Sequence, residues 1–416
     1  MAHSSKPILP PTSPVRAGAW ALYDLANTIF SLNIITLYFP VWLNDTQDVA
    51  DYSYNYALIG AMAIVLIIAP PLGHWADAHA RRRWLLNLST ILCIVATASL
   101  AFAPSAIPAL GLFICAAAAY YLASTFYDSL LTYVAPPDRQ NQISGIGVGV
   151  GYLGSIAGLH IVGRLAQGSD GVVNAPHAFI WTAVFFLIFA LPCMLLAPEG
   201  PPMHEKQNGG LRENLRQTWQ ALREHRQAWI FLIVSFLFLN GVNAVYANLG
   251  LYLNEAAQFS DAQCKGFLTL GIVAAMLAAW PIGWLAEKYH PKNALLGVIV
   301  LWIATLLLLV LDTQHRLIQV AAVFIGFGLA GAWTVTRPLL LTLVPEEQTA
   351  TFFGFNALTG RFSAIFGLGI WGLVMKIFQD RGPERYSIGL ATLAVLACVA
   401  LVLACFIPRK TQKNPA

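Results

Sequence analysis

The stretch GHWADAHARRR, residues 73–83, follows a long apolar run and is echoed further along the chain by GWLAEKYHPK, residues 283–292. The two stretches begin 210 residues apart, and each has an acidic residue four positions after its first glycine, Asp77 in one and Glu287 in the other. A second pair of loop sequences, LLTYVAPPDRQ and LLLTLVPEEQ, recurs at an offset of 209 residues. Two repeats at nearly the same offset indicate that the chain consists of two related halves.

Apolar runs long enough to cross a bilayer surround these loops. Of the 416 residues, 57% are hydrophobic and 11% are charged, whereas about 25% of residues are charged in a typical soluble domain. A bilayer core needs about 20 apolar residues per helix, and the runs are too long and too continuous for barrel strands. The sequence therefore predicts an all-α membrane protein with twelve transmembrane helices. The expected spans are 17–43, 56–76, 84–103, 106–130, 142–163, 176–197, 228–253, 264–286, 293–312, 317–341, 353–376 and 386–407.

The hydrophilic insert at residues 198–227 divides these spans into two pseudo-symmetric six-helix bundles. Its second part, from Leu211, has the spacing of a basic amphipathic helix, which we interpret as lying on the membrane surface rather than binding a regulatory protein. Parallel repeats that flank a central cavity are a common architecture of secondary transporters. The expected domains are a tail at 1–16, a bundle at 17–197, the linker at 198–227, a bundle at 228–407 and a tail at 408–416.

Basic residues indicate how the chain is oriented, because Lys and Arg are retained on the cytoplasmic side of a membrane. Sixteen of the 24 lie in the tails and loops on the side of the amino terminus, six lie on the other side, and two lie within spans. Both termini are therefore expected in the cytoplasm. Arg82 and Arg83 are interpreted mainly as part of this signal, and the net charge of +4 is attributed to topology rather than to a nucleic-acid partner.

Several stretches resemble a known family. The pattern G-x-x-x-D-x-x-x-R-R between spans two and three is similar to the hallmark of the major facilitator superfamily. AWALYDLANTIF, QISGIGVGVGYLGS, FLFLNGVNA and TRPLLLTLVPEEQTATFFGFNALTGRFSAIFG resemble its autophagy-related vacuolar amino-acid effluxer-like branch. The resemblance implies amino acids as the leading substrate class and efflux as the leading direction. At Asn240 the family usually has an acidic residue, so the resemblance implies no coupling acid at that position of this chain.

The repeated loop motif has two interpretations. Asp77 and Arg81 are one helical turn apart, and an exposed pair of this kind contributes only a few tenths of a kcal/mol, so the motif could be a topology signal alone. Alternatively, Gly73 lets two helices approach closely and Asp77 faces the positive N-terminus of the eleventh span in one conformational state. With the resemblance in support, we favour a conformational latch formed by Gly73, Asp77 and Arg81 and by their counterparts Gly283 and Glu287.

Polar residues in the first and seventh spans are candidates for contacting substrate. Spacings of three, four and seven place a set of them on one helical face: Asp24, Asn27, Thr28 and Ser31. This stripe either is satisfied by a neighbouring helix or lines a cavity, and the cost of burying a carboxylate slightly favours the cavity for Asp24. In the seventh span, the amides of Asn240 and Asn243 suit hydrogen bonding to a polar solute.

Two arginines lie within the apolar runs. Arg337 precedes a loop proline by eight residues, and the equivalent position in the first half is Asp128. At about 1.5 Å per residue, both are expected roughly 12 Å from the loop, at a depth similar to that of Asp24. The charges are interpreted as a structural ion pair, a switch that breaks during transport, or a site for a substrate carboxylate. Arg361 either joins this layer or extends to the membrane surface.

Other motifs point away from enzymes. GVGYLG, residues 149–154, matches a dinucleotide-binding pattern but lies within an apolar span, so its glycines are expected to pack helices together. There is no P-loop or nucleophile elbow, and six cysteines without paired spacing disfavour a disulfide framework or a zinc site. The prediction is a monomeric secondary active transporter of a small polar solute in a bacterial inner membrane, without a cofactor, with a proton as candidate coupling ion.

Two alternatives remain open. The first is a proton-coupled exporter of drug-like or siderophore-like compounds. The second is a non-transporting membrane receptor or scaffold, which is expected to need a soluble module or a long tail for signalling.

Overall fold

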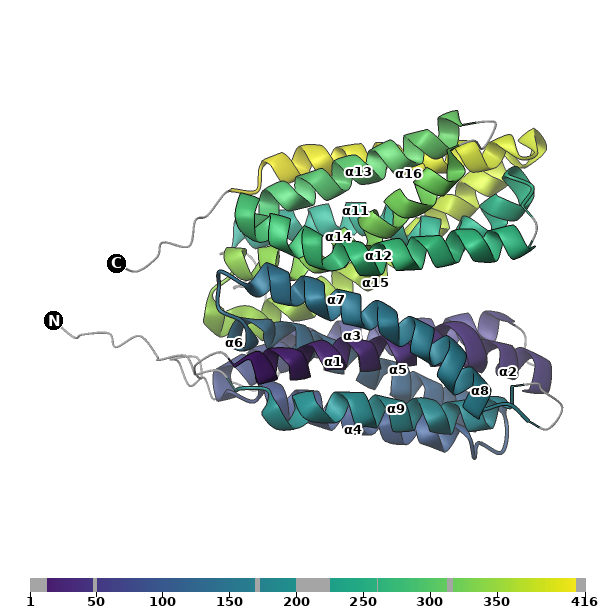
Figure 1. Cartoon of the computed structure of the whole chain (residues 1–416). Helices are drawn as coiled ribbons and strands as arrows, with labels where there is room; N and C mark the ends of the chain where they lie inside the picture. The colour runs from purple at the N-terminus through teal and green to yellow at the C-terminus, as the bar shows by residue number, and fades with distance from the viewer. Residues whose placement is uncertain are drawn as a thin grey trace. The chain divides into compact units, whose positions relative to one another are not determined.

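The computed structural model describes residues 13–47, 51–168, 173–199, 225–259, 261–312 and 317–408 (Figure 1). These residues are mostly helical, and they contain twelve helical segments that are long and apolar enough to cross a membrane. The predicted all-α class with twelve spans is confirmed. The isolated β-bridge found within these ranges joins Gln167 and Val173. The amphipathic helix expected from Leu211 lies outside the described residues.

The helices group into two compact units. Unit 1 contains Met1–Gln140, Val150–Ala221 and Pro345–Phe355, and unit 2 contains Asn141–Gly149, Leu222–Val344 and Asn356–Ala416. Each unit therefore holds most of one repeat together with a short segment from the other repeat. These two short segments belong to the starts of the fifth and eleventh spans, which makes those helix ends important for the candidate site.

The first repeat has six spans, two of which contain a π-helical stretch. Its helices are α1 (Pro14–Phe30), the π-helix η1 (Ser31–Leu37), α2 (Tyr38–Gln47), α3 (Asp51–His79), α4 (Arg82–Leu100), α5 (Ala106–Ser129), α6 (Leu131–Val134), α7 (Gln140–Ala157), the π-helix η2 (Gly158–Val162), α8 (Gly163–Leu165) and α9 (Ala175–Leu196). The start of α1 is fixed by Ser13, whose hydroxyl accepts from the Val15 N–H, and by Pro14 in the first turn.

Aromatic residues fill the core of unit 1. Helix α1 packs on α9, α9 on α4, and α4 on α5. The Tyr127 ring stacks on Trp20 and Tyr23 at centroid distances of 4.5 and 4.8 Å, and the Trp20 indole N–H donates to the Tyr127 carbonyl at 3.0 Å. All three side chains are fully buried. This aromatic cluster holds α1, which carries the predicted polar stripe, against α5.

The second repeat follows the same order of spans. Its helices are α11 (Arg226–Leu251), the π-helix η3 (Tyr252–Ala256), α12 (Asp261–Tyr289), α13 (Pro291–Leu311), α14 (Ile318–Leu343), the 3-10 helix η4 (Glu346–Gln348), α15 (Thr349–Ile377), the 3-10 helix η5 (Gln379–Arg381) and α16 (Glu384–Cys405). Within unit 2, α14 packs on α12 and α13, and α16 packs on α11 and α13. Trp302 is fully buried, and Gly328 of α14 accommodates its indole ring.

The glycines of α7 lie at close helix contacts. In unit 1, a Cβ atom at Gly154 would lie 2.5 Å from the Leu25 carbonyl oxygen, so no larger residue fits without displacement of α1. In unit 2, Gly145 lies against the Ala279 carbonyl of α12. The glycine-rich motif is therefore part of a continuous helix that packs closely, as predicted, and residues 135–139, which lead into that helix, form no strand.

Several helices extend beyond the predicted spans, including the two that meet at the first loop motif. Helix α3 continues to His79, three residues beyond the predicted end, and α15 begins at Thr349, four residues before the predicted start. Hydropathy marks where apolar side chains end, but a helix continues further when its polar residues are buried by other protein segments. The added turn of α3 carries Asp77, and the added turn of α15 carries Ala350 and Thr351.

Candidate functional site

Asp77 lies near the end of α3 and is fully buried within unit 1. Its carboxylate accepts three hydrogen bonds from the first turn of α15: from the Ala350 N–H at 3.2 Å, the Thr351 N–H at 3.0 Å and the Thr351 hydroxyl at 2.9 Å. N–H groups in a first turn have no acceptor in their own helix, and a negative charge there also complements the helix dipole. Asp77 therefore caps α15, in the position that the sequence predicted for one state of a latch.

The cation paired with Asp77 is Arg82 rather than Arg81. Arg82 Nη2 lies 2.6 Å from Asp77 Oδ1, and Arg82 Nε donates to the same oxygen at 2.7 Å, with both side chains fully buried. Arg81 is exposed. The expected one-turn spacing assumed a continuous helix, but α3 ends at His79 and Ala80 has a left-handed backbone with φ of 52°. The pairing with Arg81 is therefore corrected to Arg82, at the start of α4.

Arg82 also connects Asp77 to Tyr133. The guanidinium carbon of Arg82 lies 5.0 Å from the centroid of the Tyr133 ring, within the range of a cation–π contact. The Tyr133 hydroxyl donates to the carbonyl oxygen of Glu346 at 3.3 Å, just before α15 begins. Unit 1 thus holds the start of α15 through a carboxylate, a guanidinium and a phenol.

Sequence reasoning had not assigned a role to Tyr133 or Thr351. The signal for Tyr133 was its position within the repeated loop LLTYVAPPDRQ, and the signal for Thr351 was a threonine near an expected helix start, where its hydroxyl can make capping-type bonds. Neither signal says which carboxylate or carbonyl group the side chain reaches, because that depends on tertiary packing.

Gly73 makes the contact between α3 and α15 possible. A Cβ atom at this position would lie 2.6 Å from the Ala350 carbonyl oxygen and 3.0 Å from the Thr351 Cα. Gly73 lies one turn before Asp77 on the same helical face, so close backbone approach and carboxylate capping occur together. Gly354 of α15 also lies close to α3, with an added Cβ 3.2 Å from the Ala69 carbonyl oxygen.

The second copy of the motif repeats this arrangement within unit 2. Glu287 Oε1 accepts from the Asn141 backbone N–H at 2.5 Å and from the Asn141 side-chain amide at 3.0 Å, in the first turn of α7. A Cβ atom at Gly283 would lie 3.0 Å from the Asn141 carbonyl carbon. The basic residue that follows differs in its role, because Lys292 donates to the Cys405 carbonyl at 2.7 Å.

The polar stripe of α1 runs along α7 in unit 1. Asp24 and Asn27 are each 6% exposed, and the Thr28 hydroxyl donates to the Asp24 carbonyl at 2.8 Å. A Cβ atom at Gly151 of α7 would lie 3.0 Å from the Thr28 hydroxyl oxygen. Ser31 begins the π-helical stretch η1, a type of distortion that often occurs at functional sites.

The amides of the seventh span lie against α15 in unit 2. The Asn243 side chain donates to the Ser363 hydroxyl at 3.2 Å, and the backbone of Asn240 lies against Gly367. Asn240 is 1% exposed and donates its side-chain N–H to the Phe236 carbonyl at 2.7 Å. These predicted residues therefore share one helix pair, α11 and α15.

The remaining charged candidates occur in both units. Asp128 is half-buried near the end of α5 in unit 1, and Arg337 is half-buried in α14 of unit 2, just before Pro338. Arg361 of α15 is 9% exposed. This burial disfavours the expected alternative in which Arg361 extends to the membrane surface. A pairing of Asp128 with Arg337 stays a prediction from the repeat.

Comparisons with known proteins agree with this architecture. The profile of the family described as "Vacuole effluxer Atg22 like" matches residues 134–416. An uncharacterized MFS-type transporter, YxiO, of Bacillus subtilis is 25% identical over 418 residues, covering 95% of each chain. Autophagy-related protein 22 of Vanderwaltozyma polyspora is 24% identical over 277 residues, covering 59% of this chain and 53% of that protein.

Solved structures with low sequence identity share the fold. A bacterial homologue of the iron transporter ferroportin in an outward-facing state aligns with a TM-score of 0.74 at 12% identity, covering 94% of this chain and 99% of that one. The fucose:proton symporter FucP of E. coli aligns with a TM-score of 0.72 at 13% identity, covering 95% and 98%. With twelve spans, the repeated loop motif and a family match over more than half its length, this chain belongs to the Atg22-like vacuole effluxer family of major facilitator transporters.

Proposed function

We propose that this transporter exports a small polar solute, with amino acids or related compounds as the leading class, by alternating access. The observation that carries the proposal is the pair of acidic caps: Asp77 binds the first turn of α15, and Glu287 binds the first turn of α7. The family description, which names an effluxer, supports the direction. In this proposal both termini lie in the cytoplasm, on the basis of the basic loops. The proposed membrane is a bacterial inner membrane.

The two caps act as a latch in this proposal. Alternating access requires two halves to rock about a central site, so contacts on one side of the membrane form in one state and break in the other. An acidic cap suits this role because its hydrogen bonds are directional and its partner N–H groups become hydrated when the contact opens. A coupling of about 1–3 kcal/mol would shift the balance of states roughly 5- to 150-fold.

The substrate contacts in this proposal come from buried and half-buried polar groups of the spans. Asp24, Asn27 and Ser31 contribute from α1, and Asn240 and Asn243 contribute from α11. These groups combine carboxylate and amide oxygens with amide N–H donors, which suits a zwitterionic solute. Asp24 is the candidate for proton coupling, because the seventh span has Asn240 where the family usually has an acid.

Arg337 and Arg361 are the candidates for a substrate carboxylate, because a guanidinium can bind a carboxylate through two parallel hydrogen bonds. For Arg337, a gate formed with Asp128 is the competing role. The two roles differ in whether a negative charge at position 128 is required.

The substrate class is tested by thermal unfolding of the purified protein in the presence of single amino acids. A ligand that binds only the folded state stabilises it by about 2.7 kcal/mol at a hundredfold excess over Kd, so a substrate should raise the unfolding midpoint. Matched analogues that lack the amino or the carboxyl group should raise it less. If no amino acid has an effect and a drug-like or siderophore-like compound does, the amino-acid assignment is wrong.

The latch is tested by Asp77→Asn. We expect transport by reconstituted protein to fall at least about fivefold, with substrate affinity changed by less than about twofold, because the substitution shifts states without touching the binding residues. Asp138→Asn, which removes an exposed carboxylate from a loop on the same membrane side, serves as the matched control and should transport normally.

Asp77→Asn also leaves the buried Arg82 without its counter-charge, and breaking a buried pair typically costs about 3–5 kcal/mol. The double variant Asp77→Asn with Arg82→Gln removes both charges, so it should recover most of the lost thermal stability while transport stays low. If transport recovers together with thermal stability, Asp77 has a purely structural role and the latch proposal is wrong.

The role of Arg337 is tested by a charge swap. We expect Arg337→Ala and Asp128→Ala each to abolish transport, and Arg337→Lys to retain part of it, because lysine lacks the planar two-pronged contact. If the two residues form a gate, Asp128→Arg combined with Arg337→Asp should restore some transport. If Arg337 binds a substrate carboxylate, the swap stays inactive and Arg337→Ala loses substrate binding. Full activity of Arg337→Ala, at the level of the exposed-site control Arg381→Ala, would contradict both roles.

A further inference from the structure

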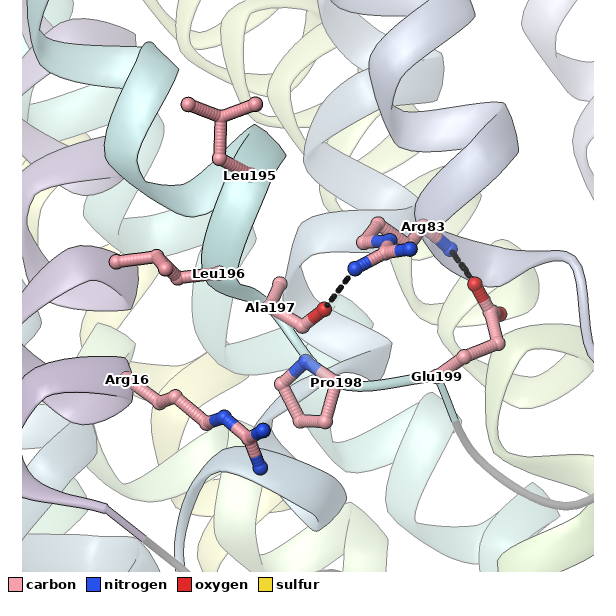
Figure 2. A pocket seen from close by; sticks show the side chains of 7 residues that line it. All are labelled: Arg16, Arg83, Leu195, Leu196, Ala197, Pro198 and Glu199. Carbon is pink, nitrogen blue, oxygen red and sulfur yellow. Dashed lines mark hydrogen bonds between the residues drawn. The ribbon is translucent and has the colours of Figure 1, made fainter.

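A pocket with a volume of about 320 Å³ lies in unit 1 where three spans end (Figure 2). It is formed by the start of α1, the start of α4 and the end of α9. The residues that line it are Arg16, Arg83, Leu195, Leu196, Ala197, Pro198 and Glu199. In Figure 2 the Ala197–Glu199 segment runs between the side chains of Arg16 and Arg83. None of these residues belongs to the latch or to the proposed substrate contacts.

The electrostatic character of the pocket is positive. Glu199 accepts from the Arg83 backbone N–H at 3.1 and 3.2 Å, so its carboxylate caps α4. Burial raises the pKa of the Glu199 carboxyl, although backbone hydrogen bonds and the two neighbouring guanidinium groups of Arg82 and Arg83 oppose this effect. The pocket is lined by two guanidinium groups and one carboxyl group, and the helix starts of α1 and α4 add positive partial charge.

The two arginines of the pocket differ in the hydrogen bonds that they make. Arg83 donates one Nη1–H to the Ala197 carbonyl at 3.0 Å, which leaves further guanidinium donors near the pocket. Arg16 makes no hydrogen bond or ion pair with any residue in the described part of the chain. A half-buried arginine beside a cavity with such spare donors indicates an anionic ligand.

The level of the pocket in the membrane indicates what that ligand is. Three spans have one end at this level: two begin here, at Pro14 and Arg82, and one ends here, at Leu196. Leu195 is 65% exposed and Trp84, next to Arg83, is 47% exposed, so apolar and aromatic side chains face outward at this level. Tryptophan is enriched at the level of the lipid headgroups. A ligand in the pocket would therefore have a headgroup phosphate beside the arginines and an acyl chain beside exposed leucines.

We propose that this pocket binds the phosphate of an anionic phospholipid, with Arg16 and Arg83 donating hydrogen bonds to its oxygens and Leu195 contacting an acyl chain. A guanidinium matches the geometry of two phosphate oxygens. The apolar rim distinguishes a lipid from a soluble phosphate, which would gain nothing from Leu195. The proposal concerns a site separate from the transported solute and does not depend on the proposed substrate class.

The test measures thermal unfolding of the purified full-length protein in detergent against increasing dioleoyl phosphatidylglycerol. This lipid should raise the unfolding midpoint, whereas dioleoyl phosphatidylcholine and inorganic phosphate at equal concentrations should not. A basic side chain near an anionic membrane surface contributes about 1 kcal/mol, which corresponds to a roughly fivefold change in affinity. Arg16→Gln should therefore weaken phosphatidylglycerol binding about fivefold, and Arg16→Gln with Arg83→Gln about 30-fold.

Arg16→Gln is the decisive single variant because it removes no hydrogen bond seen among the described residues. Arg139→Gln makes the same change at an exposed loop position on the same membrane side and should bind phosphatidylglycerol like the unmodified protein. Equal stabilisation by phosphatidylcholine would show that charge is not recognised, and equal stabilisation by inorganic phosphate would show a soluble-anion site. Either result overturns the proposal, as does unchanged phosphatidylglycerol binding by both arginine variants.

Discussion

The carboxylate of Asp77 and the first turn of α15 form the contact on which the organisation of unit 1 depends. A buried carboxylate is costly unless hydrogen bonds and an opposite charge compensate it, and here three donors from α15 and the Arg82 guanidinium do so. The hydrogen bonds require close backbone approach, which Gly73 permits. The contact therefore explains why α3 extends past the apolar run and why Pro345–Phe355 belongs to this unit.

The second copy keeps the acidic cap but changes its surroundings. Glu287 caps α7 as Asp77 caps α15, and Gly283 provides the same close approach. Asp77 is fully buried with Arg82, whereas Glu287 is half-buried and Lys292, after the loop, donates to a backbone carbonyl instead. A buried ion pair is more sensitive to the loss of one partner than a partly hydrated cap. The first copy should therefore contribute more to the balance between states than the second.

The sequence predicted the spans and the repeat, because hydropathy and spacing are local properties that survive folding. The placement of Asp77 at the start of the eleventh span is a long-range contact, and it was favoured only with the family resemblance in support. The prediction from sequence was wrong or incomplete where tertiary packing determines which side chains meet. Arg82 replaces Arg81 because Ala80 breaks the helix, and a left-handed alanine has no clear sequence signal. Thr351 and Tyr133 were missed because their partners are distant in the sequence. Asp24, Asn240 and Arg337 were selected by residue type and by their positions along the spans, and their roles toward a substrate stay predictions.

Hydrogen exchange at the start of α15 tests the central claim most directly, because the Thr351 amide is protected only while Asp77 accepts its hydrogen bond. Exchange in a peptide covering residues 349–355 should be slow in the unmodified protein and in Asp138→Asn, and clearly faster in Asp77→Asn. The rest of α15 should exchange at the same rate in all three proteins. Equal protection of this peptide in Asp77→Asn and the unmodified protein would contradict the account, because α15 would then be held without the carboxylate.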